Sequence, residues 1–260
     1  MIDKKEILKK ITNSENKIFI SKVLDRAEKA LDAGITVYTE FLDPYQQKSI
    51  ESILSNENEL RLSFFSGYTG GERAIAVLGP EGINDDYKLP LNLLEISLKN
   101  RSSLTHRDFL GSLMGLGIKR EKIGDIIVKE DMCSVIVMED IAEYISINLS
   151  KVGNTEVHIE IKPLENLTVP EPKVKEIKTT IASLRLDSVA SAGYGMSRSK
   201  MVEFIKAEKV SLNWEVTNNA SKQVKEGDTI SIRGKGRVLV KEVGGTTKKG
   251  RTGVMLEKYI

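Results

Sequence analysis

The stretch Arg185–Lys200, "RLDSVASAGYGMSRSK", holds the side chains in this 260-residue chain that are best suited to chemistry. One carboxylate, Asp187, lies two residues after Arg185 and eleven residues before Arg198. A carboxylate in an Arg-Leu-Asp triplet can be the nucleophile or base of an RNA-modifying enzyme. Arginine and lysine at this spacing can instead bind phosphate groups. The surrounding elements have to decide between a catalyst and a phosphate contact.

Two short helices are predicted to position these side chains. "IASLRLDSVASAG" has helical spacing and is ended by "AGYG", with inward positions Ile181, Leu184, Val189 and Ala192. Ser197 is a predicted N-cap, which places Arg198 and Lys200 in the first turn of the next helix. The interaction with the helix dipole disfavours each cation there by about 0.3–1 kcal/mol. They become useful when an anion occupies the helix end, so we expect a phosphate contact rather than a solvated end.

Short strands are predicted after these helices, in "KVSLNW", "VKEGDTISIRGKGRVLVKEV" and "GVMLEKYI". Arg233, Lys235 and Arg237 alternate with Gly234 and Gly236. Alternation places the three cations on one side of an extended segment, and the glycines allow a backbone to approach closely. The alternative is a solvated strand edge that its charges protect from pairing.

Charge is unevenly distributed along the chain. Residues 171–260 contain 18 Lys and Arg against 10 Asp and Glu, whereas the first 170 residues contain 21 against 27. A second basic loop, at Lys248, Lys249 and Arg251, adds to the C-terminal excess. The asymmetry favours a polyanionic partner for the C-terminal part, with a merely basic domain as the alternative.

Metal, disulfide and cofactor chemistry are not expected. Cys133 is the sole cysteine, and together with His106 and His158 it shows no ligand-like spacing. The glycines of "FSGYTGGE" lie in a predicted hairpin rather than a strand-to-helix nucleotide loop, so no cofactor is expected. Neither a signal peptide nor an apolar run of about 18 residues is visible, and a cytoplasmic location without membrane contact is expected.

Residues 1–85 are predicted to form a helical region with a β-hairpin. Residues 1 to about 57 read as helical, with a stop at Gly34 and a new start at Asp43-Pro44. The inward positions of the first long helix would be Ile18, Val23, Ala27, Ala30 and Leu31. "ELRLSFFSGYTGGERAIAVLGP" alternates, turns at its glycines and alternates again, as a hairpin does.

Residues 86–170 are predicted to form a ferredoxin-like domain. From Leu91 the elements run strand, helix, strand, strand, helix, strand, which is the split βαβ arrangement. RNA-recognition motifs share this order, but "CSVIVMED" carries none of their stacking aromatics. Around its first helix lies a second set of expected RNA contacts: His106, Arg107, Lys119 and Arg120. A capped core helix with solvated ends is the equal alternative. Residues 171–180, with two prolines nearby, read as a linker to a domain at 181–260.

The order of motifs in residues 181–260 resembles the S-four-type RNA-binding domain, two helices on a small β-sheet. The resemblance rests on "RLD", on Ser197-Arg198 with Lys200, on "VSLNW" and on "VKEGDTISIRG". Two departures stand out. Glu208-Lys209 replaces a usual glycine, and Asn213-Trp214 replaces a usual Asn-Gly, so we expect a differently shaped hairpin turn. Trp214 is either a stacking surface or, as we prefer, part of the core.

The whole chain resembles the bacterial YlmH family, through "FLDPYQ", "FSGYTGGERAIAVL" and "LTHRDFLGSLMGLGIKREKIGDI". The resemblance implies an α+β protein with a helical N-terminal region, a ferredoxin-like middle domain (βαββαβ) and a C-terminal S-four-type domain. It implies a ribosome-associated RNA-binding protein, linked to quality control of stalled large subunits carrying peptidyl-tRNA and, by genomic neighbourhood, to cell division. The RNA-binding residues would be Arg185, Asp187, Ser197, Arg198, Lys200, Asn213, Arg233, Lys235 and Arg237, with ribosomal RNA and tRNA as partners and no DNA.

Three alternatives remain beside a non-catalytic RNA binder. A pseudouridine synthase would use Asp187, but such enzymes usually carry a large catalytic domain after this module, and only 73 residues follow Asp187. A methyltransferase would need the nucleotide loop that is missing here. A protein–protein adaptor linked to cell division stays open, because the acidic N-terminal region could serve it.

Overall fold

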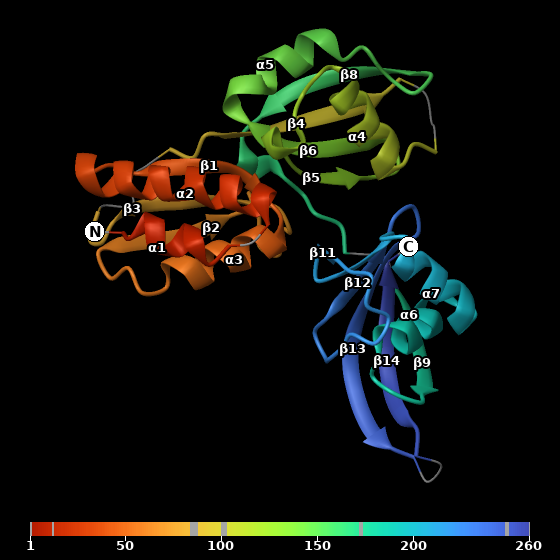
Figure 1. Cartoon of the computed structure of the whole chain (residues 1–260). Helices are drawn as coiled ribbons and strands as arrows, with labels where there is room; N and C mark the ends of the chain where they lie inside the picture. The colour runs from red at the N-terminus through yellow and green to blue at the C-terminus, as the bar shows by residue number, and fades with distance from the viewer. Residues whose placement is uncertain are drawn as a thin grey trace. The chain divides into compact units, whose positions relative to one another are not determined.

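The computed structural model describes residues 2–11, 13–83, 88–99, 103–171, 174–247 and 250–259 (Figure 1). The chain divides into two compact units, Met1–Pro170 and Glu171–Ile260. Each unit combines helices with antiparallel sheets around apolar clusters of its own, so the predicted α+β class is confirmed. Lys248 and Lys249 of the predicted second basic loop lie outside the described residues.

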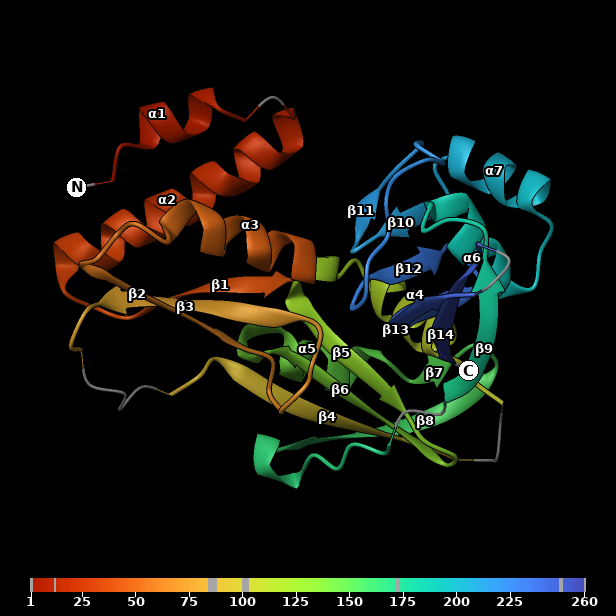
Figure 2. The same cartoon turned by 90° about the horizontal axis from the view of Figure 1, so that it is seen from below.

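The first part of the Met1–Pro170 unit places helices on one face of a small sheet, as Figure 2 shows. The helices are α1 (Lys4–Lys9), α2 (Ser14–Ala33) and α3 (Pro44–Leu54). The strands, in the order β1-β3-β2, are β1 (Val37–Leu42), β3 (Ala74–Pro80) and β2 (Leu60–Phe65). β2 and β3 pair antiparallel, which confirms the predicted hairpin.

Two expectations for this region are corrected. Residues 37–42 form strand β1 rather than helix, because "VYTEFL" is rich in β-branched and aromatic residues and buries Thr39 and Phe41 in alternation. Ile18 is 61% exposed, because the buried stripe of α2 runs through Ile20, Leu24 and Ala27 on the other side of the helix. The predicted helix boundaries are confirmed: Gly34 ends α2 with φ +65°, and Asp43 and Gln46 form a capping box at the start of α3.

The second part of this unit is a ferredoxin-like sheet with two covering helices. The elements are β4 (Leu91–Leu98), α4 (His106–Gly115), β5 (Ile123–Val128), β6 (Met132–Met138), α5 (Glu139–Asn148), β7 (Lys151–Val152) and β8 (Thr155–Lys162). The strand order is β5-β6-β4-β8-β7, and each neighbouring pair is antiparallel. β4 and β6 are central and contain no aromatic residue, so the stacking surface of an RNA-recognition motif is missing from them.

The two sheets of the Met1–Pro170 unit share a layer of apolar side chains. Phe41 and Ile75 of the first sheet cluster with Leu91, Ile136 and Met138 of the second. The approach is close enough to require glycine. A Cβ at Gly124 would lie 2.7 Å from the Phe41 ring. A Cβ at Gly67, in "FSGYTGG", would likewise lie 2.8 Å from Ile136 Cδ1. Gly124 and Gly67 therefore have a packing role.

Asp125 joins the two sheets by hydrogen bonds. Its carboxylate accepts from Tyr68 Oη at 2.9 Å, from the backbone amide of Glu72 at 2.7 Å and from that of Arg73 at 3.1 Å. These donors belong to the loop between β2 and β3, whereas Asp125 lies on β5. The carboxylate thus fixes a glycine-rich loop that has little regular structure of its own.

Replacing Asp125 by alanine is expected to lower the free energy of unfolding by about 1–3 kcal/mol, because partly buried donors lose their acceptor. Urea denaturation followed by circular dichroism measures the change. Asp32→Ala, at an exposed position of α2, is the matched control and should stay within about 0.5 kcal/mol of the unchanged protein. Equal effects of the two substitutions would contradict the bridging role of Asp125.

The Glu171–Ile260 unit has two helices on a long antiparallel sheet. The helices are α6 (Leu186–Tyr194) and α7 (Arg198–Lys206). The strands, in the order β11-β10-β12-β13-β14-β9, are β11 (Glu215–Val216), β10 (Val210–Leu212), β12 (Thr229–Ile232), β13 (Gly236–Thr246), β14 (Thr252–Tyr259) and β9 (Val174–Ile181). Buried residues of both helices, such as Val189 and Met201, pack on sheet residues such as Val238 and Leu256.

The linker expected at 171–180 is corrected by β9. Residues 174–181 pair with β14 along its whole length, from Val174 with Tyr259 to Ile181 with Thr252. The alternation of charged and apolar residues, which suggests a linker in the sequence, belongs to a strand. This strand places Ile177 and Ile181 against the core of the unit. Since Ile181 ends this strand, helix α6 begins at Leu186 and not at Ile181 as predicted.

Candidate nucleic-acid interface

Arg185, Asp187 and Arg198 form one hydrogen-bonded network at the start of the two helices. Arg185 donates from Nε to Asp187 Oδ1 at 3.2 Å and from Nη2 to Oδ2 at 3.1 Å. Arg198 donates from Nη2 to both carboxylate oxygens, at 3.1 and 3.0 Å. The Asp187 side chain is only 4% exposed, whereas those of Arg185 and Arg198 are 36% and 49% exposed. A buried carboxylate thus holds two partly exposed guanidinium groups.

Local backbone structure brings these residues together. Arg185 is the N-cap residue of α6 and pairs with Gln223 in an isolated bridge. Gly195 ends α6 with φ +65°, which turns the chain so that α7 can begin at Arg198. Asp187 lies in the first turn of α6, where a negative charge also suits the helix dipole.

The network sets the charge state of Asp187. Burial disfavours its carboxylate form, but the hydrogen bonds and charges of Arg185 and Arg198 outweigh burial and hold its pKa below the usual value. The carboxylate is therefore ionised at neutral pH, with both oxygens accepting from guanidinium groups. The three side chains together carry one net positive charge.

The stability of the C-terminal unit is expected to depend on pH through Asp187. A folded-state pKa below that of the unfolded chain, about 3.9, stabilises the fold above that pH. The contribution is lost as the pH falls through the lower folded-state pKa. The difference in unfolding free energy between the unchanged protein and Asp187→Asn should thus shrink from pH 6 to pH 3 in urea titrations. A difference that does not change with pH would contradict this.

Ser197 and Lys200 occupy the predicted helix start. Ser197 Oγ accepts a hydrogen bond from the backbone amide of Lys200 at 3.3 Å, so the predicted N-cap is confirmed. Lys200 is exposed. The guanidinium of Arg198 points toward Asp187 and not outward from the start of α7.

Arg233, Lys235 and Arg237 are not on one side of an extended strand, which corrects the alternation argument. Arg233 and Lys235 lie in the turn between β12 and β13, and Arg237 alone of the three is in β13. Lys235 and Lys209 each place their Nζ 5.8 Å from the centroid of the Phe204 ring. Lys235 of this turn and Lys209, which precedes β10, thus form a basic pair over the Phe204 ring of α7.

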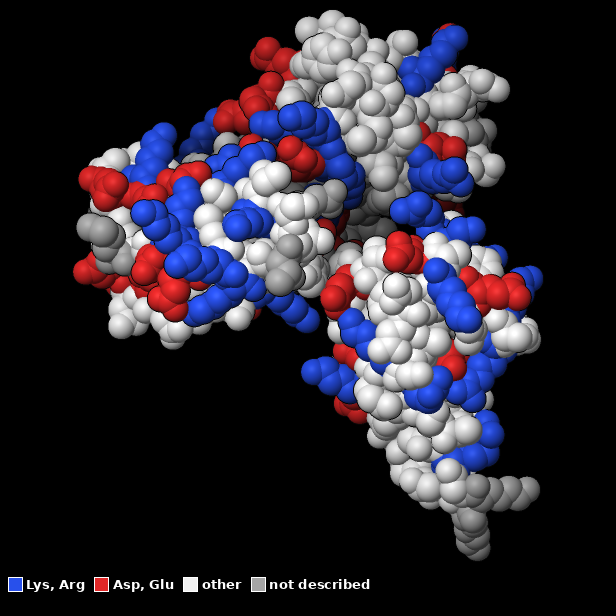
Figure 3. Space-filling model, in the orientation of Figure 1, with Lys and Arg blue, Asp and Glu red and all other residues white. Residues whose placement is uncertain are grey.

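Arg237 has a separate environment from that group. Its guanidinium carbon lies 3.9 Å from the centre of the Tyr259 ring. Such a contact holds a guanidinium flat against an aromatic face. On the face seen in Figure 3, basic side chains are spread over the Glu171–Ile260 unit, with acidic ones among them. The Arg185–Asp187–Arg198 network is therefore the better-defined feature of this unit.

Asn213 and Trp214 form the two-residue turn between β10 and β11, with φ +51° and +66°. These are the positive angles that Asn-Gly adopts in such hairpins, so the expected difference in turn shape is wrong. Glu208 likewise takes φ +54° in place of the usual glycine. A left-handed conformation is unfavourable by roughly 1–2 kcal/mol for a residue other than glycine. Trp214 is half-buried and lies outside the buried core, which corrects the preferred core position.

The second set of expected contacts surrounds α4. Arg107 and Lys119 are exposed. His106 keeps access to solvent, but desolvation by surrounding atoms and the charge of Arg120 lower its pKa, so it is neutral at pH 7. Arg120 is half-buried, donates to the carbonyl oxygens of Ile123 and Gly124, and has a pKa lowered to about 10 by burial and by Arg73. Arg120 therefore supports the turn before β5.

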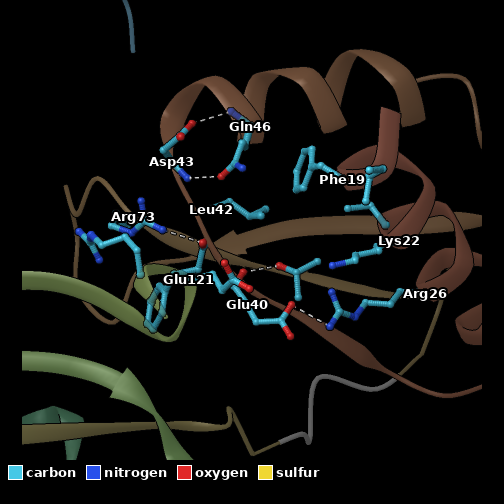
Figure 4. Close-up of a pocket in the computed structure, with 14 residues that line it drawn as sticks. Phe19, Lys22, Arg26, Glu40, Leu42, Asp43, Gln46, Arg73 and Glu121 are labelled. Atoms are coloured by element: carbon cyan, nitrogen blue, oxygen red, sulfur yellow. Dashed lines mark hydrogen bonds and ion pairs between the residues drawn. The ribbon is translucent and has the colours of Figure 1, made fainter. Parts of the chain in front are cut away.

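Arg120 also lines a cavity of about 450 Å³ within the Met1–Pro170 unit, shown in Figure 4. Its lining mixes the cations Lys22, Arg26, Arg73 and Arg120 with the carboxylates of Glu40, Asp43 and Glu121. Arg26 pairs with Glu40 at 2.8 Å, and Arg73 Nη2 donates to the neutral Phe41 carbonyl at 2.8 Å. Positive and negative groups therefore lie together in the cavity wall.

Within the described part of the chain, no three His, Cys, Asp or Glu side chains gather as metal ligands would. None of its helices is long and apolar enough to cross a membrane.

Family models match three successive parts of the chain. "YlmH, N-terminal" matches residues 15–83, "Putative RNA-binding domain in YlmH" matches 83–166, and "S4 domain" matches 184–230. The S4 match contains the Arg185–Asp187–Arg198 network and the Asn213-Trp214 turn. The two RNA-binding models define the chain as an RNA-binding protein with a C-terminal S4 domain, the S-four-type module expected from the sequence.

The similarity to known relatives extends over most of the chain. The "Ribosome-associated protein quality control protein P2" of Bacillus subtilis (strain 168) is 34% identical over 246 residues, which are 94% of this chain and 95% of that protein. The solved structure of "Cell division protein ylmH from Streptococcus pneumoniae" shares the fold, with a TM-score of 0.53 at 22% identity over 61% of this chain and 98% of that one. The chain belongs to the YlmH family, as its motifs predict.

Proposed function

We propose that this protein is a non-catalytic RNA-binding protein that associates with ribosomal RNA and tRNA on the large ribosomal subunit. Its role would be the quality control of stalled peptidyl-tRNA complexes in the cytoplasm. The observation that carries the proposal is the Arg185–Asp187–Arg198 network within the S4 match. The Bacillus subtilis relative, named for ribosome-associated quality control, supports the ribosomal setting.

The network suits phosphate binding because its arginines are oriented in advance. A guanidinium has five N–H donors, and the bonds to Asp187 use only Nε and Nη2 of Arg185 and Nη2 of Arg198. The remaining donors can bind phosphate oxygens, and the fixed side chains have less conformational entropy to lose on binding. Lys200, Arg233 and Lys235 would add exposed cations, and Ser197 would hold the start of α7 in place.

The same geometry argues for a positioning role of Asp187 and against catalysis by it. A base or nucleophile needs a lone pair directed at its substrate. Both oxygens of Asp187 accept from arginines, and the side chain is 4% exposed. A substrate base would have to displace these arginines to reach it.

The proposal is tested by crosslinking the protein to RNA in cells and sequencing the attached RNA. We expect large-subunit ribosomal RNA and tRNA. Recovery of neither would overturn the ribosomal role. Ribosome association that survives nuclease treatment would instead favour a protein–protein adaptor, and uridine isomerisation that Asp187→Asn abolishes would favour an enzyme.

Arg198→Gln is expected to weaken binding to purified large subunits about five- to tenfold at low salt, as loss of one hydrogen bond of roughly 1–1.5 kcal/mol predicts. The fold should persist, because Arg185 still neutralises Asp187. Lys241→Gln is the matched control, since Lys241 is already paired with Glu257 on the same sheet. Co-sedimentation measures both variants, and equal affinity for the two would count against the Arg185–Asp187–Arg198 network.

A further inference from the structure

Trp214 is held in a backbone conformation that does not suit it. It follows Asn213 in a turn where both residues have positive φ, and the second place of such a turn favours glycine. A bulky side chain in this conformation is a genuine outlier. Outliers of this kind persist where the surrounding structure enforces them, and they cluster where ligands are gripped.

The surrounding structure does enforce this turn. Asn213 donates from Nδ2 to Asp228 Oδ1 at 2.8 Å and accepts at Oδ1 from the amide of Thr229 at 2.9 Å. Its own amide donates to the Thr229 carbonyl at 2.8 Å. Asp228 is buried, so these bonds anchor the turn to the body of the unit. Because Trp214 directly follows Asn213 in the turn, these hydrogen bonds also constrain the backbone of Trp214.

Burial of the indole does not account for a tryptophan at this place. Leu212, at the end of β10, is buried in the core, but Trp214 is half-buried and outside that cluster. Within the described residues the indole N–H donates no hydrogen bond, although a buried tryptophan usually finds a partner. Val216, on the same hairpin, is 54% exposed. The hairpin therefore presents apolar surface on an otherwise basic unit.

The segment that follows the hairpin contacts the Arg185–Asp187–Arg198 network. The amides of Leu186 and Asp187 donate to the carbonyls of Lys222 and Ala220, at 2.9 and 3.1 Å. Ala220 lies six positions after Trp214, a span of at most about 22 Å even when fully extended. A few nucleotides of RNA bound at Arg185 and Arg198 can therefore reach the hairpin.

We propose that Trp214 is a stacking surface for an unpaired RNA base, and that the locked Asn213 turn presents it. The inference rests on the proposed function, to which it adds a contact with a base. Stacking tolerates any base because every base has an aromatic face. Unpaired bases in loops and single strands are the ones free to stack, whereas bases within a duplex are not. Glycine would relax the turn but would offer no such surface.

The test uses the full-length protein and single-stranded oligoadenylate of about 12 nucleotides, a typical site length. Trp214 is the sole tryptophan of the chain, so its emission reports on this position alone. Anisotropy of fluorescein-labelled RNA gives the affinity independently. Trp214→Gly removes the ring and relaxes the turn, and Trp214→Phe keeps an aromatic face. Glu208→Gly is the matched control, because it relaxes φ +54° in the same unit without removing an aromatic ring.

We expect single-stranded RNA to quench the emission of Trp214. A duplex of the same length should quench it less. Trp214→Gly should lose about 5- to 150-fold in affinity, the range for one stacked base, with no fall in melting temperature. Trp214→Phe should lose less, and Glu208→Gly should bind normally. Binding without quenching, equal affinity of Trp214→Gly, or a markedly lower melting temperature of that variant would each overturn the inference while leaving RNA binding intact. Absence of any RNA binding at low salt would overturn the proposed function itself.

Discussion

Replacing Arg185 and Arg198 together by alanine is expected to lower the free energy of unfolding of the C-terminal unit by about 3–5 kcal/mol. Asp187 is the reason. Its side chain is 4% exposed and both its oxygens accept from these two arginines. Removing both partners leaves an ionised carboxylate buried without a counter-charge, whereas removing one leaves the other in place. Emission of Trp214 in urea follows this unit specifically.

The matched control is the triple variant that also carries Asp187→Ala. With the buried charge gone, it should recover most of the lost stability, as replaced buried ion pairs often do. A double variant as stable as the unchanged protein would mean that Asp187 does not depend on the arginines. The same result explains why RNA binding has to be tested with single substitutions, since loss of the fold would imitate loss of a contact.

Binding to ribosomal RNA is expected to weaken about 250-fold between 50 and 200 mM salt. This follows from a slope of about −4 in the logarithm of affinity against that of salt, for five phosphate contacts at roughly −0.7 to −0.9 each. The five cations are Arg185, Arg198, Lys200, Arg233 and Lys235, which are exposed or partly exposed in the structure. Filter binding of the full-length protein at several salt concentrations measures the slope.

Single charge removals refine the salt prediction. Lys235→Gln should reduce the slope by roughly 0.7 to 0.9, the share of one phosphate contact. Lys241→Gln should leave the slope unchanged, because Lys241 is paired with Glu257 and lies near Glu176. An affinity that hardly responds to salt would argue against phosphate contacts altogether. Equal slopes for Lys235→Gln and the unchanged protein would remove the β12–β13 turn from the interface.

Local signals in the sequence were sufficient for the element types of most of the chain. Gly34, Asp43-Pro44 and Ser197 mark helix ends because their effects need only neighbouring backbone amides and carbonyls. The order of elements from Leu91 onward predicts the ferredoxin-like arrangement for a similar reason. Alternation and helical periodicity reflect which face of each element is buried. The strand at 174–181 escapes prediction because it forms by pairing with the distant β14, whereas 37–42 carries a local strand signal in its β-branched and aromatic residues.

Sequence alone determined the family, the basic C-terminal module and the charged residues at the start of its two helices. These features depend only on residue type and spacing. The tertiary structure decided what those residues do. It buries Asp187 between two arginines that stand two and eleven positions away, and it separates Arg237 from Arg233 and Lys235. It also shows that Asn213-Trp214 keeps the turn of an Asn-Gly pair. Burial, side-chain direction and strain depend on the packing of residues distant in the chain, which spacing along the sequence does not encode.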